Sequence, residues 1–317
     1  MSVTIKPFKS TDLGAVLRLL RDAMSADAIS DARFTRQVLL DPNFRPEGAL
    51  VALHDDREEN GDHDVVGFCL SIARQVPLEN APGDADRGYI TLIAVAPDQQ
   101  RRGIGTRLLQ HAEAYLKSQG RSLVMVSSYA PGYFTPGVDV NAYAGGLSFF
   151  KKHGYAEVYR PLAMEASLWS LQCPAWVRER AAAFSILPFE PILALRLIDF
   201  VAREFPGDWV RVVRETAGRI VAGESPDRLL IALDKGEIVG FSHYENERFG
   251  PIGVAASHRG RGVGQVLMFA TLQAQRQAGF RAAWFLWSDD KTAQRLYHAA
   301  GFKETRRFAL LKRSLID

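Results

Sequence analysis

The chain has 317 residues, which is long enough for two domains that each bury a core. Hydrophobic residues make up 47% and charged residues 24% of it, as in ordinary globular proteins, which excludes collagen-like and extensively disordered chains. The net charge of +3 is too small to indicate a nucleic acid or an anionic membrane as a partner.

The N-terminal region and the cysteines indicate the compartment. Charged residues from Lys6 to Asp27 interrupt the first thirty positions, so no signal-peptide core is present, and no run approaches the roughly 18 apolar residues of a membrane helix. Cys69 and Cys173 are too few and too far apart for a disulfide framework or a metal-ligand pair. We therefore expect a cytoplasmic protein that holds no metal.

In chain order, the first half begins with paired helices over 11–40 and an antiparallel pair of strands over 49–53 and 65–73. The charged segment 54–64 between these strands predicts a solvated loop rather than a metal site. The next elements are a buried strand over 89–95, a helix from Ile104 closed by Gly120, a strand over 123–126 and a helix that ends at Gly154. This order predicts a mixed α/β domain.

The second half repeats the order. Helices are predicted over 191–222, and strands over 229–233 and 237–244 are joined by Asp234-Lys235-Gly236, which has the residue types of a tight hairpin. A strand at 252–255, a helix closed by Gly279, a strand over 282–287 and a helix ending at Gly301 follow. We predict an N-terminal domain over 1–168, a linker over 169–184 and a C-terminal domain over 185–317.

A glycine motif occurs once in each half, as Gln100-Arg101-Arg102-Gly103-Ile104-Gly105 and as Arg259-Gly260-Arg261-Gly262-Val263-Gly264. Each copy joins a strand to a helix, so it presents free backbone N–H groups at the positive end of the helix dipole. Glycine lets a phosphate approach the backbone, and arginine adds charge-assisted hydrogen bonds. The predicted anion sites are Gln100, Arg102, Gly103, Ile104 and Gly105 in the first half, and Arg259, Arg261, Gly262, Val263 and Gly264 in the second.

Other interpretations of the motif fit less well. One alternative is that the glycines only form a tight turn and bind no ligand, because glycine permits a tight turn in any protein. A nicotinamide-dinucleotide site needs a third glycine and an acidic residue about twenty positions on, which makes an oxidoreductase the least favoured interpretation. A phosphate-binding P-loop is excluded, since no Gly-Lys-Ser/Thr follows either turn.

A glycine motif after a hydrophobic strand, followed by Ala-x-x-x-Tyr-x-x-x-Gly-Phe at 293–302, resembles the GNAT family of N-acetyltransferases. The layout is similar to that of tandem members such as mycothiol synthase. The resemblance implies an α/β fold with two tandem acetyltransferase-type domains, each a mixed, mostly antiparallel, splayed sheet flanked by helices. It also implies acetyl-CoA as co-substrate, with its pyrophosphate on the glycine turn and its pantetheine arm beside Val95 or Val254.

The resemblance further implies that Tyr297 protonates the departing thiolate as a general acid. Phe150 stands at the matching position of the first half and cannot donate a proton. We therefore predict that the C-terminal domain is the catalytic one. Two alternatives stay open: Tyr143 or Tyr133 could substitute in the first half, and Tyr297 could be an aromatic packing residue.

The general base is less well marked. His243, Glu245 and Glu247 lie on or near one strand, where alternate side chains would face the cleft, and we predict Glu245 as the base. The loop over 129–139, rich in proline, glycine and aromatic residues, is either an acceptor contact or a rigid connection. Within it, Asp139 is predicted to face a cationic acceptor.

These patterns together predict acetyl transfer from acetyl-CoA to a primary amine of a small molecule or a protein. The alternative is a catalytically silent CoA-binding protein with a regulatory or interaction role. Neither the identity of the acceptor nor the oligomeric state follows from the sequence.

Overall fold

The computed structural model describes residues 3–54, 64–79, 83–223 and 229–316, so most of the predicted loop over 54–64 lies outside the described residues. The chain divides into two compact units. The first comprises Met1–Pro77, Gly83–Arg160 and Phe308–Asp317, and the second comprises Leu78–Pro82 and Pro161–Arg307. The units therefore differ from the predicted ranges, because the predicted linker belongs to the second unit and the C-terminal residues belong to the first.

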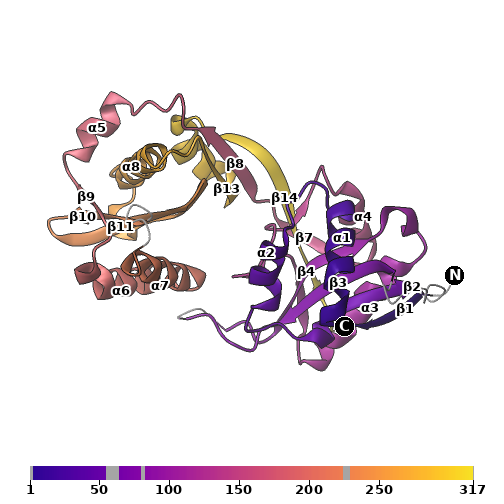
Figure 1. Ribbon diagram of the computed structural model, residues 1–317. Helices are drawn as coiled ribbons and strands as arrows, with labels where there is room; N and C mark the ends of the chain where they lie inside the picture. Colours follow the sequence, from indigo (N-terminus) through magenta and orange to yellow (C-terminus); the bar gives the residue numbers. More distant parts are fainter. Residues whose placement is uncertain (1–2, 55–63, 80–82, 224–228, 317) are drawn as a thin grey trace. The chain divides into compact units, whose positions relative to one another are not determined.

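The first unit is built on a mostly antiparallel sheet (Figure 1). Its strands, in spatial order, are β1 (Val3–Pro7), β2 (Ala49–His54), β3 (Val65–Ala73), β4 (Arg87–Val95), β5 (Leu123–Val126), the end of β14 (Lys303–Ser314) and β7 (Ala156–Tyr159), and the short β6 (Val138–Asp139) also pairs with β14. Within this unit, β4 and β5 form the parallel pair.

Helices cover both faces of this sheet. They are α1 (Leu13–Ala23), α2 (Asp31–Phe34) with a π-helical turn over Thr35–Leu39, α3 (Ile104–Ser118) and α4 (Ala144–Lys152). Because side chains alternate along a strand, Phe68 and Leu70 of β3 join Leu20 of α1 in one core, whereas Cys69 joins Leu108 of α3 in the other. The sheet is thus buried on both sides.

The second unit has the same plan. Its strands, in spatial order, are β9 (Ser185–Pro188), β10 (Leu229–Asp234), β11 (Glu237–Glu245), β12 (Arg248–Val254), β13 (Ala282–Ser288), β8 (Leu162–Ser167) and the start of β14. Its helices are α5 (Ala175–Ala181), α6 (Ala194–Glu204), α7 (Asp208–Val221), α8 (Val263–Gln277) and α9 (Asp290–Thr292), which continues as a π-helical turn over Ala293–Tyr297. One core lies under α6 and α7, and α8 packs on the other face.

The local predictions from the sequence are confirmed. The hairpin between β10 and β11 has positive φ at Lys235 (50°) and Gly236 (85°), as a two-residue hairpin loop requires. Gly120 and Gly279 follow α3 and α8 with φ of 75° and 93°, the left-handed conformation that ends a helix. The predicted α/β fold with mostly antiparallel sheets is also what the structure has.

The last strand of each sequence repeat completes the sheet of the other unit. In the first unit, the end of β14 lies between β5 and β7, with Leu311 opposite Val126 and Glu157. In the second unit, β8 from the first half of the sequence lies between β13 and the start of β14. Neither half of the sequence therefore contains all the strands of one sheet.

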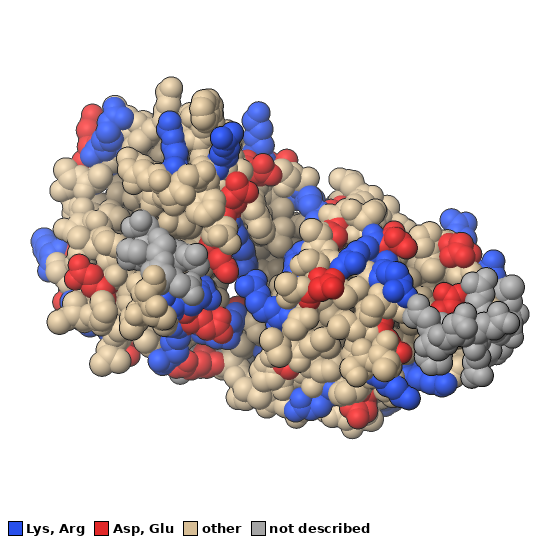
Figure 2. All heavy atoms as spheres, viewed as in Figure 1, with Lys and Arg blue, Asp and Glu red and all other residues tan. Residues whose placement is uncertain are grey.

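The surface and the helices give further information on partners. On the face drawn in Figure 2, Lys and Arg are interspersed with Asp and Glu over the described residues of both units. No helix in the described part of the chain is long and apolar enough to cross a membrane. Within the same residues, no group of three or more His, Cys, Asp or Glu side chains is arranged to hold a metal ion.

The exchanged strand yields a test. Leu311 is fully buried in the core of the first unit, so Leu311→Ala should lower the free energy of unfolding by about 2–4 kcal/mol. Hydrogen exchange should become faster in β5 and stay unchanged in β10, whereas the exposed neighbour Lys312→Ala should change neither. Faster exchange in β10 and not in β5 would contradict the strand exchange.

Candidate functional site

The first glycine turn connects β4 to α3. After β4 ends at Val95, a short helical turn leads to Gly103, whose φ of 82° is left-handed and which caps the start of α3. Arg101 also has a positive φ, 61°. A β-carbon built on Gly103 would meet nothing within 4 Å, so the space beside the turn is open. Open N–H groups at the first turn of a helix are suited to binding an anion.

The sheet of the first unit opens next to this turn. The pairing of β4 with β5 ends at Ile90 and Val126. On its other side, the register of β4 with β3 shifts between Ile90 and Leu92, which leaves Thr91 as an extra residue. From Thr91 to Val95, β4 has no neighbour on its β5 side among the described strands. The backbone of this edge can pair with the amide groups of a ligand.

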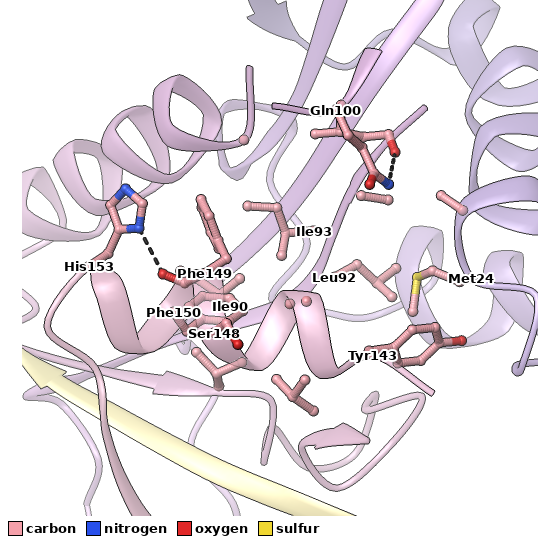
Figure 3. A pocket seen from close by; sticks show the side chains of 18 of the residues that line it. Met24, Ile90, Leu92, Ile93, Gln100, Tyr143, Ser148, Phe149, Phe150 and His153 are labelled. Atoms are coloured by element: carbon pink, nitrogen blue, oxygen red, sulfur yellow. Dashed lines mark hydrogen bonds between the residues drawn. The ribbon is translucent and has the colours of Figure 1, made fainter. Parts of the chain in front are cut away.

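A cavity of about 1000 Å³ follows this edge. Its wall combines the edge of β4, the glycine turn, the end of β5 and α4. Lining residues include Met24, Ile90, Thr91, Leu92, Ile93, Val95, Gln100, Arg101, Gly103, Gly105, Thr106, Ser127, Thr135, Tyr143, Phe149, Phe150, Lys152 and His153. In Figure 3, Met24, Leu92 and Tyr143 lie on the side opposite His153 and Phe149. The volume is that of a pocket for a large ligand.

At the glycine end, hydrogen bonds hold the wall in place. The Gln100 amide donates to the carbonyl of Val95 at 3.2 Å. Nδ1 of His153 lies 2.8 Å from the carbonyl of Phe149 and therefore donates to it, while Nε2 lies 3.1 Å from the Thr106 hydroxyl. In the neutral ring, Nε2 then accepts the hydroxyl proton of Thr106, which fixes the imidazole against the first turn of α3.

The opposite end of the cavity is mostly apolar with a few hydroxyl groups. The Tyr143 hydroxyl donates to a carboxylate oxygen of Asp27 at 2.7 Å, and Asp27 is buried with 9% of its surface exposed. The Ser127 hydroxyl donates to the carbonyl of Thr135 at 2.9 Å. From the sequence, Tyr143 is one of two candidate proton donors in the first half, with Tyr133, because neither residue lies in a motif. Asp27 belongs to no motif, and it comes next to Tyr143 only in the folded chain.

The loop over 129–139 has features of both predicted interpretations, because hydrogen bonds fix it and Thr135 and Gly137 line the cavity. Arg33 donates to the carbonyl of Phe134 at 2.9 Å, which ties the loop to α2. Asp139 is 3% exposed and accepts the backbone N–H groups of Asn141 and Ala142, both at 2.9 Å. The prediction that Asp139 faces a cationic acceptor was wrong, because its carboxylate holds the turn before α4.

The second glycine turn repeats the backbone of the first. Gly262, with φ of 90°, caps the start of α8, and β12 pairs with β13 only at Arg248. Nε of Arg259 donates to the carbonyl of Val254 at 3.4 Å, in the same way that Gln100 bonds the preceding strand in the first unit. The two motifs are therefore equivalent in conformation.

Their side chains differ from the prediction in several places. The side chains of Ile104 and Val263 point into the cores, with 4% and 1% of their surfaces exposed, so they anchor the helices, and a contact of their backbone N–H groups with a phosphate stays a prediction. Arg261 forms an ion pair with Asp234 at 2.9 Å. Arg102 is exposed and does not line the cavity. Of the predicted residues, the structure places Val95, Gln100, Gly103 and Gly105 on the cavity wall.

The space beside the second turn is occupied. A β-carbon built on Gly262 would lie 2.8 Å from Cδ of Arg180 in α5. Gly264 has as much room for a side chain as Gly105. A β-carbon built on Gly264 would lie 3.5 Å from Val254 and 3.8 Å from Leu296. Arg180 could not be identified from the sequence, because it lies in the predicted linker and outside every motif.

Tyr297 lies in an aromatic cluster of the second unit. Its ring centroid is 4.5 Å from that of Phe285, 5.5 Å from Phe302 and 6.2 Å from Phe249. It is 7% exposed, and burial raises the pKa of its hydroxyl well above the usual value. These contacts give Tyr297 a packing role; its role as general acid stays a prediction.

The predicted base, Glu245, is partly exposed at the end of β11. Its neighbour His243 is 4% exposed and lies 3.0 Å from the Thr216 hydroxyl and 3.1 Å from the carbonyl of Gly250. Burial lowers the pKa of His243 to about 4. A neutral, enclosed imidazole of this kind stabilises the fold, whereas the role of Glu245 as base stays a prediction.

Comparison with known proteins agrees with the repeat. Residues 15–132 match the model of the acetyltransferase (GNAT) family, and residues 225–304 match that of an acetyltransferase (GNAT) domain. No curated protein sequence matches the chain.

Solved structures share the fold over nearly the whole chain. A GCN5-related glucosamine N-acetyltransferase region of a fungal multi-domain β-N-acetylglucosaminidase is 19% identical, with a TM-score of 0.79; the match covers 98% of this chain and 38% of that one. A GCN5-related N-acetyltransferase from Sphaerobacter thermophilus is 18% identical (TM-score 0.71; 98% and 95% covered). A tandem GNAT protein from the clavulanic acid biosynthesis pathway is 16% identical (TM-score 0.60; 99% and 98% covered).

The lowered pKa of His243 predicts that the folded protein loses stability in acid. Its pKa is about 4 in the folded protein, against an ordinary value of 6.5, so the unfolded chain binds the proton more readily between these values. Stability should therefore fall as the pH drops from 6.5 to 4, by ~3 kcal/mol from this group. Urea unfolding of the wild type and of His243→Gln at several pH values checks this. Equal pH dependence in both proteins would contradict it.

Proposed function

Because the chain belongs to the acetyltransferase (GNAT) family, we propose that it transfers the acetyl group of acetyl-CoA to a primary amine, with the cavity of the first unit as the donor site. The observation that carries this proposal is the cavity itself, which begins at the open glycine turn and follows the unpaired edge of β4. This assignment differs from the expectation that the C-terminal domain is catalytic, which rested on Tyr297.

The lining of the cavity suits the donor. The pyrophosphate would lie on the N–H groups at the start of α3, where Arg101 and Lys152 add positive charge. The edge of β4 from Thr91 to Val95 would pair with the amides of the pantetheine arm. When bound, acetyl-CoA supplies an activated acetyl group that an amine can attack.

Tyr143 and Asp27 are the residues that we propose take up the proton of the acceptor amine. An ammonium group must lose a proton before its nitrogen can attack the thioester carbonyl. As the new N–C bond forms, the C–S bond would break, and the second proton that the nitrogen loses would leave on the sulfur of CoA as the thiol. The Tyr143 oxygen can accept a proton while its own moves along the 2.7 Å hydrogen bond to the carboxylate of Asp27. We assign these two residues the removal of the proton from the acceptor.

The acceptor end favours a hydroxyl-bearing amine that carries no charged group besides the amine itself. Ser127, Thr135 and Tyr143 contribute hydroxyl groups, and no Asp or Glu is among the described residues that line the cavity. A polyamine would need carboxylates there to replace the water around its charges. Glucosamine is the first acceptor to test, because the fungal region of similar fold is named for that activity.

A catalytically silent CoA-binding protein is the second candidate. It is favoured by Phe150, which stands on the cavity wall where the second repeat has Tyr297, and which cannot donate a proton. Turnover with any primary amine rules out this candidate.

Gly105 tests the donor site. A β-carbon at Gly105 has room between Val95 and Phe149, at 3.7 and 3.5 Å, so the rest of a leucine side chain would extend into the cavity. We expect Gly105→Leu to weaken acetyl-CoA binding at least tenfold by calorimetric titration, because it fills the space of the ligand. The matched change Gly264→Leu in the second repeat should leave binding intact. If instead Gly264→Leu abolishes binding, the donor site lies in the second unit.

The two tyrosines test where the chemistry occurs. Tyr143→Phe should lower turnover by ten- to a hundredfold without weakening acetyl-CoA binding, as removal of a proton-transfer group does. Tyr297→Phe and Glu245→Gln should leave turnover unchanged if the first unit is the catalytic one. Release of CoA with a panel of amino sugars, amino acids and polyamines measures this. A loss confined to Tyr297→Phe or Glu245→Gln would support the C-terminal site that the family resemblance predicts.

A further inference from the structure

The two glycine turns have the same backbone but different surroundings. Gly103 and Gly262 have φ of 82° and 90°, and both cap a long helix. A β-carbon on Gly103 would meet no atom within 4 Å, whereas one on Gly262 would lie 2.8 Å from Arg180. An equivalent turn is therefore open in the first unit and covered in the second.

The part of Arg180 that covers the turn is its hydrocarbon stem. Cδ lies closest to the built β-carbon of Gly262, while Nε and Nη1 are both 3.5 Å away. The guanidinium group also lies beside the start of α8, where Nη1 donates to the Gln265 side chain at 3.0 Å, and it stacks over Trp176 at 5.0 Å. A phosphate on this turn would have to take the place of the stem.

The covering helix is held by the unit to which it belongs. Val177 of α5 is 2% exposed and packs in the same core as Val266 and Phe269 of α8. Arg180 itself is exposed, and Trp176 and Gln265 contact it from two sides. The helix is thus a packed element of the second unit, and Arg180 extends from it across the start of α8.

Electrostatics do not explain this position. A cation at the N-terminal end of a helix is repelled by the helix dipole. Arg180 also forms no ion pair with a carboxylate among the described residues. The packing of α5, together with the stacking and the amide hydrogen bond, holds the side chain there against that repulsion.

We propose that α5 and Arg180 form a built-in cover over the second glycine turn, so that the protein binds one acetyl-CoA, in the first unit, while its second turn is blocked. Removal of the cover would expose a second site with an intact glycine turn. This inference rests on the proposed function, because it takes the first unit to be the donor site.

Calorimetric titration with acetyl-CoA tests the cover in five proteins. The wild type should bind one equivalent, and Gly105→Leu should bind none. Arg180→Ala should bind two, and the double variant Gly105→Leu/Arg180→Ala should regain one. Arg178→Ala is the matched control: it lies on the same helix, is exposed and bonds the carbonyl of Cys173, so it should bind one equivalent like the wild type.

Other results would contradict either the proposed function or the cover by Arg180. If the wild type binds none, the proposed function fails. If the wild type binds two, the turn is not blocked and the cover is refuted while the donor site stands. If Gly105→Leu binds none and the double variant binds none as well, the cover is refuted. Weaker binding in Arg180→Ala than in the wild type would make Arg180 a ligand of the phosphate, which also overturns the proposal.

Discussion

The site depends on the point at which β4 and β5 stop pairing. Their register ends at Ile90, where the extra residue Thr91 also shifts the pairing with β3. Past that point the backbone of β4 keeps an edge that no described strand covers, so the sheet has a gap there that is bordered by unpaired backbone N–H and C=O groups. The glycine turn begins α3 at the far end of this edge, and α4 borders the gap. A ligand with an anionic head for the glycine turn and an amide-bearing arm for the edge of β4 matches the order of these surfaces along the cavity.

The same backbone occurs twice, yet the repeats differ in access. Both turns have left-handed glycines, and both preceding strands have their last carbonyl bonded by the first side chain of the motif, Gln100 or Arg259. The difference lies in what packs beside the turn. The first turn opens on a cavity, whereas Arg180 of α5 lies over Gly262. A duplicated motif therefore does not by itself give two equal sites.

Local features were predictable from the sequence, and long-range features were not. The hairpin at Lys235 and Gly236 was predicted because the turn conformation depends on those residues alone. The exchange of β8 and β14 could not be predicted, because strand partners are set by packing between distant segments. The hydrogen bond between Tyr143 and Asp27 spans 116 residues, so no spacing rule reveals it. The cover by Arg180 has the same origin.

Phe150 and Tyr297 occupy the same motif position, and both are buried although only one of them is a phenol. Its counterpart Phe150 is 2% exposed and packs edge-on against Tyr155, and Tyr297 is 7% exposed and packs against Phe302 in the same manner. In both repeats, therefore, the side chain at this position packs the last helix of the repeat against the sheet. A phenol there keeps its proton because burial raises its pKa, and a phenylalanine fills the same space. Under the proposed function, proton transfer in the first unit needs a side chain that reaches the cavity and has a polar partner, and Tyr143, with its hydrogen bond to Asp27, is the residue that we propose for it.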